Sequence, residues 1–279
     1  MKDSKPNGEI SIIFRRNARG RTYMAKQYFK IPLQVLKPHY YDVDGTAIVY
    51  LLNPSGGVLQ HDRLLTSIVS EAGTDAIVTT PGNSKYYKMD EGCAGIRNDL
   101  YVHKGGVLEY LPEHNVPFAH SEVYQENEFH IEKGGVLFAA DMVTAGRVAS
   151  GEVFQYRRYA SKTCIYADGE LQLYDNCSME PGEEDLRRTG LLEGRLSNGT
   201  FYAYAESISQ DLCERINELN TREVRLAAGK ITPDLMVVRF IGDSIIEMTA
   251  TMHKVWGLCR QSILGKPGIH LRKEFSYHK

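Results

Sequence analysis

Short apolar segments separated by turn residues dominate the first two-thirds of the chain. Each segment is rich in β-branched and aromatic side chains and is bounded by glycine, asparagine, aspartate or proline. Such segments are typical of β-strands. The clearest are residues 9–14, 47–52, 64–69, 74–80 and 200–204. They predict a mainly β body over about residues 10–206.

A weak internal repeat runs through this β-rich region. Each unit consists of a strand, a polar pair, a glycine turn and a second strand. The units that match best are residues 68–77, 101–110 and 130–139, and a poorer copy covers 165–171. Their glycines, Gly73, Gly106 and Gly135, are 33 and 29 residues apart. Units that cannot bury an apolar face alone are stabilised by stacking on their neighbours. The repeat therefore predicts an elongated body of stacked sheets that resembles a β-solenoid. An antiparallel sandwich whose hairpins share glycine turns is the alternative.

The hydrophobic period becomes helical in the C-terminal part, about residues 207–279. Within 207–219, apolar residues recur at the spacing of one helix face. A second helix begins at the capping box from Ser244 to Glu247 and ends at Gly265. Its apolar stripe consists of Ile245, Met248, Met252, Val255, Cys259 and Ile263, with Trp256 beside it, and strands are expected at 224–228 and 235–240. We expect about two helices packed against the β body, within a single domain spanning residues 1–279.

Composition narrows the class of protein and its partners. The chain is 42% hydrophobic and 24% charged, with a formal net charge of −2, which is typical of globular proteins. A charge balance so close to neutral gives no reason to expect nucleic acid as a partner. No apolar run approaches the ~20 residues of a membrane span, and the first residues lack the apolar core of a signal peptide. Five widely spaced cysteines fit structural thiols in a reducing compartment. We therefore expect a cytoplasmic protein with no membrane partner.

Familiar catalytic motifs are missing from the sequence. It contains no Walker A, GxGxxG, HExxH or GxSxG pattern, and His114 and His120 are too loosely spaced to indicate a metal site. Carboxylates at strand ends or beside glycines are more suggestive. These are Asp62, Glu109, Glu113, Asp141 and Glu152. If several faced one cavity, they would suit a hard or borderline cation that is held weakly.

The segment Asn53–Leu64 places turn residues and a charged pair between two apolar strands. Pro54 restricts φ, and Gly56–Gly57 permits a positive φ or a close approach of two backbones. The segment ends in Asp62 and Arg63, so we expect a carboxylate with a fixed position. That carboxylate either lines a metal path or is a structural partner of an arginine.

Arg147 lies between Gly146 and Gly151 in a second glycine-containing segment. Its guanidinium can bind a carboxylate through two parallel hydrogen bonds. The carboxylate belongs either to a binding partner or, in a structural ion pair, to Glu152 or Asp141.

At these residues the chain resembles the UreD family of urease accessory proteins, called UreH in some organisms. Four blocks match in the family's order: N-P-x-G-G-x-x-x-x-D-R-L at 53–64, T-T-x-x-x-x-K-x-Y at 79–87, L-E-(W/Y)-L-P at 108–112 and G-R-x-x-x-G-E-x-F at 146–154. The family-motif residues are Asn53, Pro54, Gly56, Gly57, Asp62, Arg63, Lys85, Tyr87, Gly146, Arg147, Gly151 and Glu152. Together the blocks are specific, and the similarity covers essentially the whole chain.

The resemblance implies a non-enzymatic chaperone for urease maturation. Family members bind apo-urease and the all-helical protein UreF, and UreF recruits the GTPase UreG, which supplies nickel. The resemblance also implies a β-rich, elongated fold with a small helical part and an internal tunnel for nickel, with no tightly bound cofactor. Candidate residues along such a metal path are Asp62, Glu109, Asp141 and Glu152.

A β-solenoid enzyme that acts on carbohydrate through paired carboxylates is the alternative from another class. Such an enzyme needs two carboxyl groups about 5–10 Å apart in an open cleft. Burial of Asp62 and Glu152 inside the body would exclude it.

Overall fold

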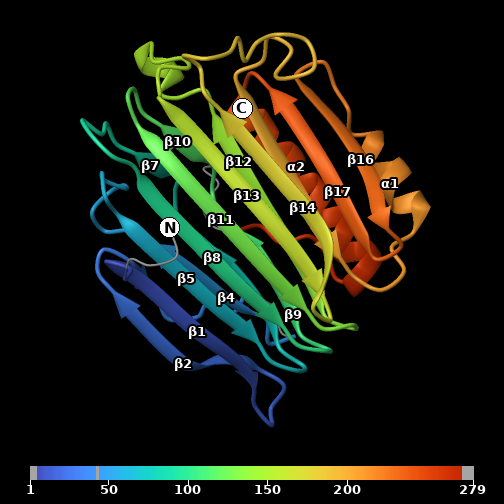
Figure 1. Ribbon diagram of the computed structural model, residues 1–279. Coiled ribbons are helices and arrows are strands. Elements are labelled where there is room, and N and C mark those ends of the chain that lie inside the picture. The colour runs from blue at the N-terminus through green and yellow to red at the C-terminus, as the bar shows by residue number, and fades with distance from the viewer. Residues whose placement is uncertain (1–4, 42–43, 272–279) are drawn as a thin grey trace.

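The chain forms two stacked β-sheets, with two helices on the far side of the second sheet (Figure 1). The computed structural model describes residues 5–41 and 44–271, so residues 272–279 of the expected C-terminal part lie outside it. The first sheet has the order β14 (Glu170–Met179), β13 (Arg158–Ala167), β11 (Glu122–Ile131), β8 (Ala94–Val102), β5 (Arg63–Ser70), β1 (Gly8–Arg16) and β2 (Thr22–Lys30). The second has the order β16 (Val224–Thr232), β17 (Leu235–Gly242), β15 (Ser197–Tyr204), β12 (Val136–Thr144), β9 (Val107–Leu111), β6 (Asp75–Thr79), β4 (Ala47–Leu52) and β3 (Gln34–Val35). Two short strands lie beside this order: β10 (Asn115–Pro117) pairs with β12 and with β7 (Ser84–Tyr86).

Successive strands alternate between the two sheets and pair in parallel, which is the arrangement of a β-solenoid. The chain passes from β4 to β5, from β6 through β7 to β8, from β9 through β10 to β11, and from β12 to β13. In the first sheet, Ile68 pairs with Leu100, and Leu100 pairs with Phe129, both in parallel register. The predicted β-solenoid-like stack is therefore confirmed. The alternative of an antiparallel sandwich is wrong for this part of the chain.

The glycine turns of the repeat stack on one another, but not in the alignment that we predicted. The Gly73 N–H donates to the Gly105 carbonyl at 3.0 Å, and the Gly105 N–H donates to the Gly134 carbonyl at 2.9 Å. Gly73 is thus equivalent to Gly105 and Gly134, rather than to Gly106 and Gly135. All three stacked glycines have a positive φ, of 72°, 73° and 87°, which favours glycine. Each later unit has two adjacent glycines, so the local pattern does not identify the one that forms the turn.

Helix α1 (Gln210–Asn217) is shorter than the predicted helix 207–219. Ser209 is its N-cap, because the Ser209 Oγ accepts a hydrogen bond from the Leu212 N–H. Ser207 has a φ of 55°, which is incompatible with an earlier helix start.

Helix α2 (Ile245–Cys259) begins after its N-cap Ser244, as the capping box predicts. It continues as a π-helix over Arg260–Leu264 and ends at Gly265, whose φ is 65°. Most of the predicted apolar stripe packs against the second sheet, and the fully buried members are Met248, Met252, Val255 and Cys259, together with Trp256. Within residues 5–41 and 44–271, no helix combines the length and the hydrophobicity that crossing a bilayer requires.

Both faces of the second sheet are covered, and this decides where its side chains lie. On β12, Phe138, Ala140 and Met142 belong to the core beneath the helices, whereas Ala139 lies in the core between the two sheets. Side chains alternate between the faces of a strand. Asp141 therefore faces the first sheet, where a carboxylate is costly unless it finds partners.

Candidate functional site

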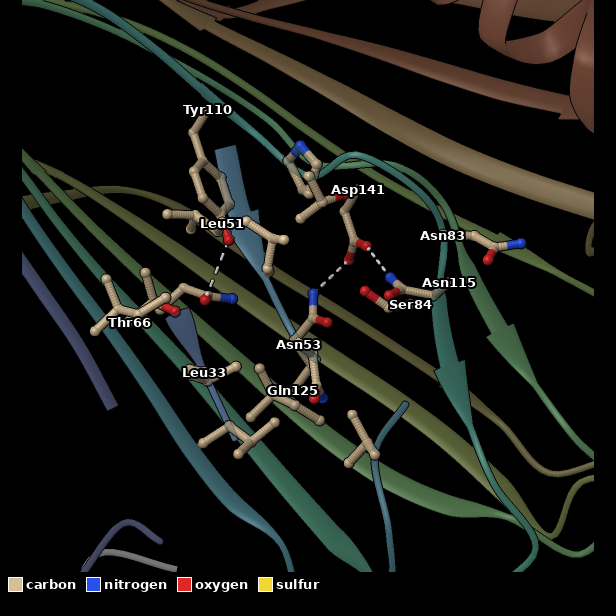
Figure 2. A pocket seen from close by; sticks show the side chains of 18 of the residues that line it. Leu33, Leu51, Asn53, Thr66, Asn83, Ser84, Tyr110, Asn115, Gln125 and Asp141 are labelled. Carbon is tan, nitrogen blue, oxygen red and sulfur yellow. Dashed lines mark hydrogen bonds between the residues drawn. The ribbon is translucent and has the colours of Figure 1, made fainter. Parts of the chain in front are cut away.

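A cavity of about 250 Å³ lies between the two sheets, beside Asp141 (Figure 2). Its polar wall residues include Thr66, Asn98, Gln125 and Asn127 from the first sheet and Tyr110, Asp141 and Tyr202 from the second. At the rim the wall also includes Asn53, Thr80, Asn83, Ser84 and Lys85. Asn98, Asn127 and Thr163 form a ladder across three neighbouring strands: the Asn98 Nδ2 donates to Asn127 Oδ1 at 2.8 Å, and the Asn127 Nδ2 donates to Thr163 Oγ1 at 3.0 Å. The cavity wall thus provides many neutral oxygen and nitrogen atoms.

Asp141 is the one carboxylate among the described residues that line this cavity. Its Oδ1 accepts a hydrogen bond from Asn115 Nδ2 at 2.9 Å, and its Oδ2 accepts from Gln125 Nε2 at 3.0 Å and from Ser161 Oγ at 2.7 Å. The Tyr159 hydroxyl lies 3.5 Å from Oδ1. All four partners are neutral. Figure 2 shows the Asn115 and Asp141 side chains pointing toward one another.

Among the described residues, none that hydrogen-bonds to the Asp141 carboxylate carries a positive charge, although Lys85 lines the larger cavity and Arg239 the smaller one. Burial raises the pKa of the Asp141 carboxyl above its usual value, although the hydrogen bonds from Ser161, Gln125 and Tyr159 oppose that effect. Within the described residues, Asp141 belongs to no ion pair with lysine or arginine. A carboxylate that is solvated by dipoles alone attracts a cation that can enter the cavity.

A second cavity, of about 30 Å³, shares Asp141 and Tyr202 with the first. It lies toward β14 and β17 and is also lined by Asp175 and Arg239. The Asp175 carboxylate accepts hydrogen bonds from the Tyr202 hydroxyl at 2.6 Å and from Arg239 Nη2 at 2.8 Å. Asp141 therefore lies where the two cavities meet.

The first two family blocks meet at the rim of the larger cavity. The Val58 N–H donates to the Lys85 carbonyl at 2.8 Å, and the Tyr87 N–H donates to the Val58 carbonyl at 3.0 Å. The side chain of Asn53 ties the turn by donating to the Gly57 carbonyl at 2.9 Å. A Cβ at Gly57 would lie 2.6 Å from the Tyr87 ring and 2.7 Å from the Lys85 carbonyl oxygen. The Gly57 position therefore requires glycine because the two segments touch there.

The last family block, residues 146–154, is linked to the second block through the ring of Phe118. The Tyr87 ring packs edge to face on Phe118 at 5.2 Å, and the Arg147 guanidinium lies 4.2 Å from the centre of the Phe118 ring. Arg147 also forms an ion pair with Glu152, so Glu152, rather than Asp141, is its carboxylate within the chain. Gly146 has a φ of 125°, and a Cβ at this position would lie 2.8 Å from the Glu152 carbonyl oxygen.

The four carboxylates that we considered for a metal path do not gather. Asp62 is buried outside the cavity, and Glu109 lies on the opposite face of the second sheet, beneath α2. Glu152 is held by Arg147 and by the Ala119 N–H at 3.1 Å. Among the described residues, no group of three histidine, cysteine or acidic side chains could hold a metal ion. Asp141 alone of the four lies on the cavity.

Sequence reasoning missed the neutral partners of Asp141. Asn115, Gln125, Ser161 and Tyr159 come from three strands, β10, β11 and β13, and none belongs to a recognisable motif. Their one shared signal is that each is a polar side chain within a strand, on a face that is otherwise buried.

Comparison with known proteins identifies the family. The model of the family described as UreD urease accessory protein matches residues 6–274. Three relatives carry the name urease accessory protein UreD. The protein of Cenarchaeum symbiosum is 39% identical over 199 residues, 70% of each chain. That of Cupriavidus pinatubonensis is 30% identical over 273 residues, 96% of this chain and 94% of the relative. That of Bacillus cereus is 27% identical over 272 residues, 96% of this chain and 98% of the relative. The chain belongs to the UreD family of urease accessory proteins, which are chaperones rather than enzymes.

Proposed function

We propose that the chain is a maturation scaffold that binds apo-urease and UreF in the cytoplasm and passes nickel between its two sheets. UreG joins through UreF in this proposal, and nickel is the cargo. Membership of the UreD family supports a role in urease maturation. The observation that carries the nickel path is the Asp141 carboxylate, which lies at the junction of two cavities and has only neutral partners.

The chemistry around Asp141 suits a cation that must leave again. One carboxylate with amide and hydroxyl oxygens nearby is a weak ligand set for a divalent cation. Thiolates would bind nickel more tightly, and Cys177 lines the second cavity. Burial raises the pKa of the Cys177 thiol to about 11, so near neutral pH its proton must leave before the sulfur can bind a metal, and that cost weakens binding. The cavity therefore suits a nickel ion that passes through it better than one that is stored there.

The proposal assigns the metal path to Asp141 and assigns structural roles to Asp62, Glu109 and Glu152. Each of these three has its partners within the chain: amide groups for Asp62, Arg260 and Trp256 for Glu109, and Arg147 for Glu152.

The decisive experiment is Asp141→Asn in cells that lack the natural gene product but carry urease and the other accessory proteins. Nickel per urease active site should fall severalfold at limiting nickel, whereas pull-down of UreF should stay at the wild-type level. Asp90→Asn is the matched control because the Asp90 side chain is 80% exposed at the surface. Wild-type nickel loading by the Asp141 variant would refute the path through Asp141. Full urease activity without the chain would refute the maturation role itself.

The carbohydrate enzyme expected as the alternative lacks support. Paired carboxylates in one open cleft are its requirement, and Asp141 is the sole described carboxylate on the larger cavity. Asp175 joins Asp141 only at the smaller cavity, whose volume of about 30 Å³ does not hold a sugar ring. Asp62 is buried elsewhere, Glu152 is bound to Arg147, and the family consists of accessory proteins.

A further inference from the structure

The N-terminal segment of residues 10–41 concentrates positive charge in a chain whose formal net charge is −2. Residues 10–41 contain no aspartate or glutamate. The cations of this run are Arg15, Arg16, Arg19, Arg21, Lys26, Lys30 and Lys37. Segregation of one sign of charge on one element produces a local field that attracts an oppositely charged partner.

Among the described residues, carboxylates leave most of this charge without an ion pair, although Glu9 lies opposite Lys30 in the strand register. Arg15 pairs with Glu71, and within residues 5–41 and 44–271 it is the one cation of the run in an ion pair with a carboxylate. Arg16 donates to the Gly73 carbonyl, and Lys30 Nζ donates to the Pro6 carbonyl. Lys26 extends into solvent from the middle of β2.

Strand β2, which carries Lys26 and Lys30, lies at the edge of the first sheet, where Figure 1 shows it in blue. It pairs with β1 on one side, and among the described residues the sheet order gives it no neighbour on the other. Its residues 25–30 are all exposed. A terminal strand presents backbone N–H and C=O groups to which another extended chain can pair.

The register divides the side chains of β2 between two faces. Phe29 pairs with Ile10, which is buried between the sheets, so Phe29 lies on the inner face. Lys26, Tyr28 and Lys30 therefore share the outer face, at alternate positions. The two lysines flank an exposed tyrosine on a single stripe.

Exposed apolar side chains distinguish this edge strand from one whose lysines serve only to prevent unwanted strand pairing. Lysines on an edge strand often prevent unwanted pairing, but such an edge should not also expose large apolar side chains. Here Tyr23, Tyr28, Phe29 and Ile31 are 39%, 48%, 40% and 76% exposed. This combination of cations and apolar groups is typical of a surface that a partner covers.

We infer that β2 binds an acidic, extended polypeptide segment of a partner protein, which adds to the first sheet as an extra strand. Backbone hydrogen bonds would supply affinity, and alternate acidic side chains opposite Lys26 and Lys30 would supply specificity. A second copy of β2 does not fit, because its own lysines would face these lysines. Nucleic acid does not fit either, because it has no peptide groups to pair with the edge.

The test uses short fluorescent peptides and the full-length chain. The probe alternates threonine and glutamate, so that all its carboxylates lie on one face of a strand. One control peptide has prolines at two threonine positions, which preserves the charge but prevents strand pairing. A second control peptide replaces glutamate with lysine. Oligothymidylate and phosphatidylglycerol vesicles test for general attraction to anions.

We expect the glutamate peptide to bind and both control peptides to fail. The double variant Lys26→Glu/Lys30→Glu should bind the glutamate peptide at least about tenfold more weakly, since two favourable cross-strand pairs become repulsive. The same variant should gain binding to the lysine peptide. Lys104→Glu/Lys133→Glu, an equal charge change at exposed turn residues, should leave binding unchanged.

Three results would overturn the inference. The first is absence of glutamate-peptide binding at low salt. The second is equal binding of the proline peptide, which would indicate attraction of charge without strand addition. The third is a preference for oligothymidylate or for the vesicles over the peptide.

Discussion

Arg260 and Glu109 form an ion pair in which neither side chain exposes any surface to solvent. Trp256 donates its indole N–H to the same carboxylate. The pair joins the π-helical end of α2 to β9 in the second sheet, on the face opposite the cavity. Burial of two charges is costly, and one donor of the arginine, Nη2, has no hydrogen-bond partner among the described residues. The pair therefore determines how the helix docks on the sheet, although the desolvation of its two charges opposes folding.

Removal of one partner should destabilise the protein far more than removal of both. Glu109→Gln leaves a buried guanidinium without its counterion, and we expect the free energy of unfolding to fall by about 3–5 kcal/mol. The double variant Glu109→Gln/Arg260→Met should recover most of that loss. Urea denaturation measures both.

The partly exposed pair of Arg195 and Asp243 provides the control. Asp243→Asn should cost at most about 1 kcal/mol because solvent screens that pair. A similar small cost for Glu109→Gln would contradict the view that the buried pair determines helix docking.

Local signals in the sequence predict the elements well, whereas contacts between distant residues have no such signal. Residues 47–52 form β4 as expected, and Ser244 caps α2 as its capping box predicts. The register between strands decides which glycine of each later repeat unit aligns with Gly73. Two adjacent glycines in each of those units leave that choice open. Glu109 and Arg260 are 151 positions apart, and nothing local in either segment points to the other.

The candidate site shows the same limit. Asp141 stood out in the sequence because it is a carboxylate near a glycine-containing motif. Asn115, Gln125 and Ser161 are neutral and come from separate strands, so only the fold brings them to the carboxylate. The sequence thus indicates the charge of the site but not the dipoles that surround it.

Asp62→Asn should lower stability and affect nickel loading only through the amount of folded protein. The Asp62 Oδ1 accepts a hydrogen bond from Asn7 Nδ2, and Oδ2 accepts one from the Leu59 N–H, both at 2.8 Å. An asparagine presents an N–H₂ group to one of these donors, which leaves a buried mismatch. We expect a loss of about 1–3 kcal/mol, measured by thermal melting, with Asp90→Asn as control. A normal melt combined with poor nickel loading would instead restore Asp62 to the metal path.

Gly57→Ala should be much more damaging than Gly82→Ala, although both glycines lie at the rim of the cavity. A Cβ at Gly57 would collide with the Tyr87 ring and the Lys85 backbone, whereas a Cβ at Gly82 would meet nothing within 4 Å. Overpacking of this kind typically costs about 1–3 kcal/mol. Denaturant midpoints of the two variants measure the difference. Equal midpoints would show that the two family blocks separate easily at the rim.

The charge on Asp141 should appear as a pH dependence of stability. Burial raises the pKa of this carboxyl in the folded chain above its value in the unfolded chain, and the neighbouring Asp175 charge adds to the rise. The folded state therefore binds the proton more tightly. The stability that this tighter proton binding contributes is fully present when the pH is below the pKa of the carboxyl in the unfolded chain. It is lost as the pH rises through the pKa of the carboxyl in the folded chain.

Asp141→Asn removes this titration while keeping the shape of the side chain. The free energy of unfolding of the wild type should therefore fall relative to that of the variant as pH rises from about 4 toward neutral. Any fixed cost of the amide at this position shifts the whole curve and leaves its slope unchanged. Urea denaturation of both proteins at several pH values, in the presence of a chelator, measures the slope. The difference in unfolding free energy between the two proteins could instead stay constant or favour the wild type as pH rises. Either result would mean that a positive group already compensates Asp141, and the argument for a cation path at this carboxylate would fail.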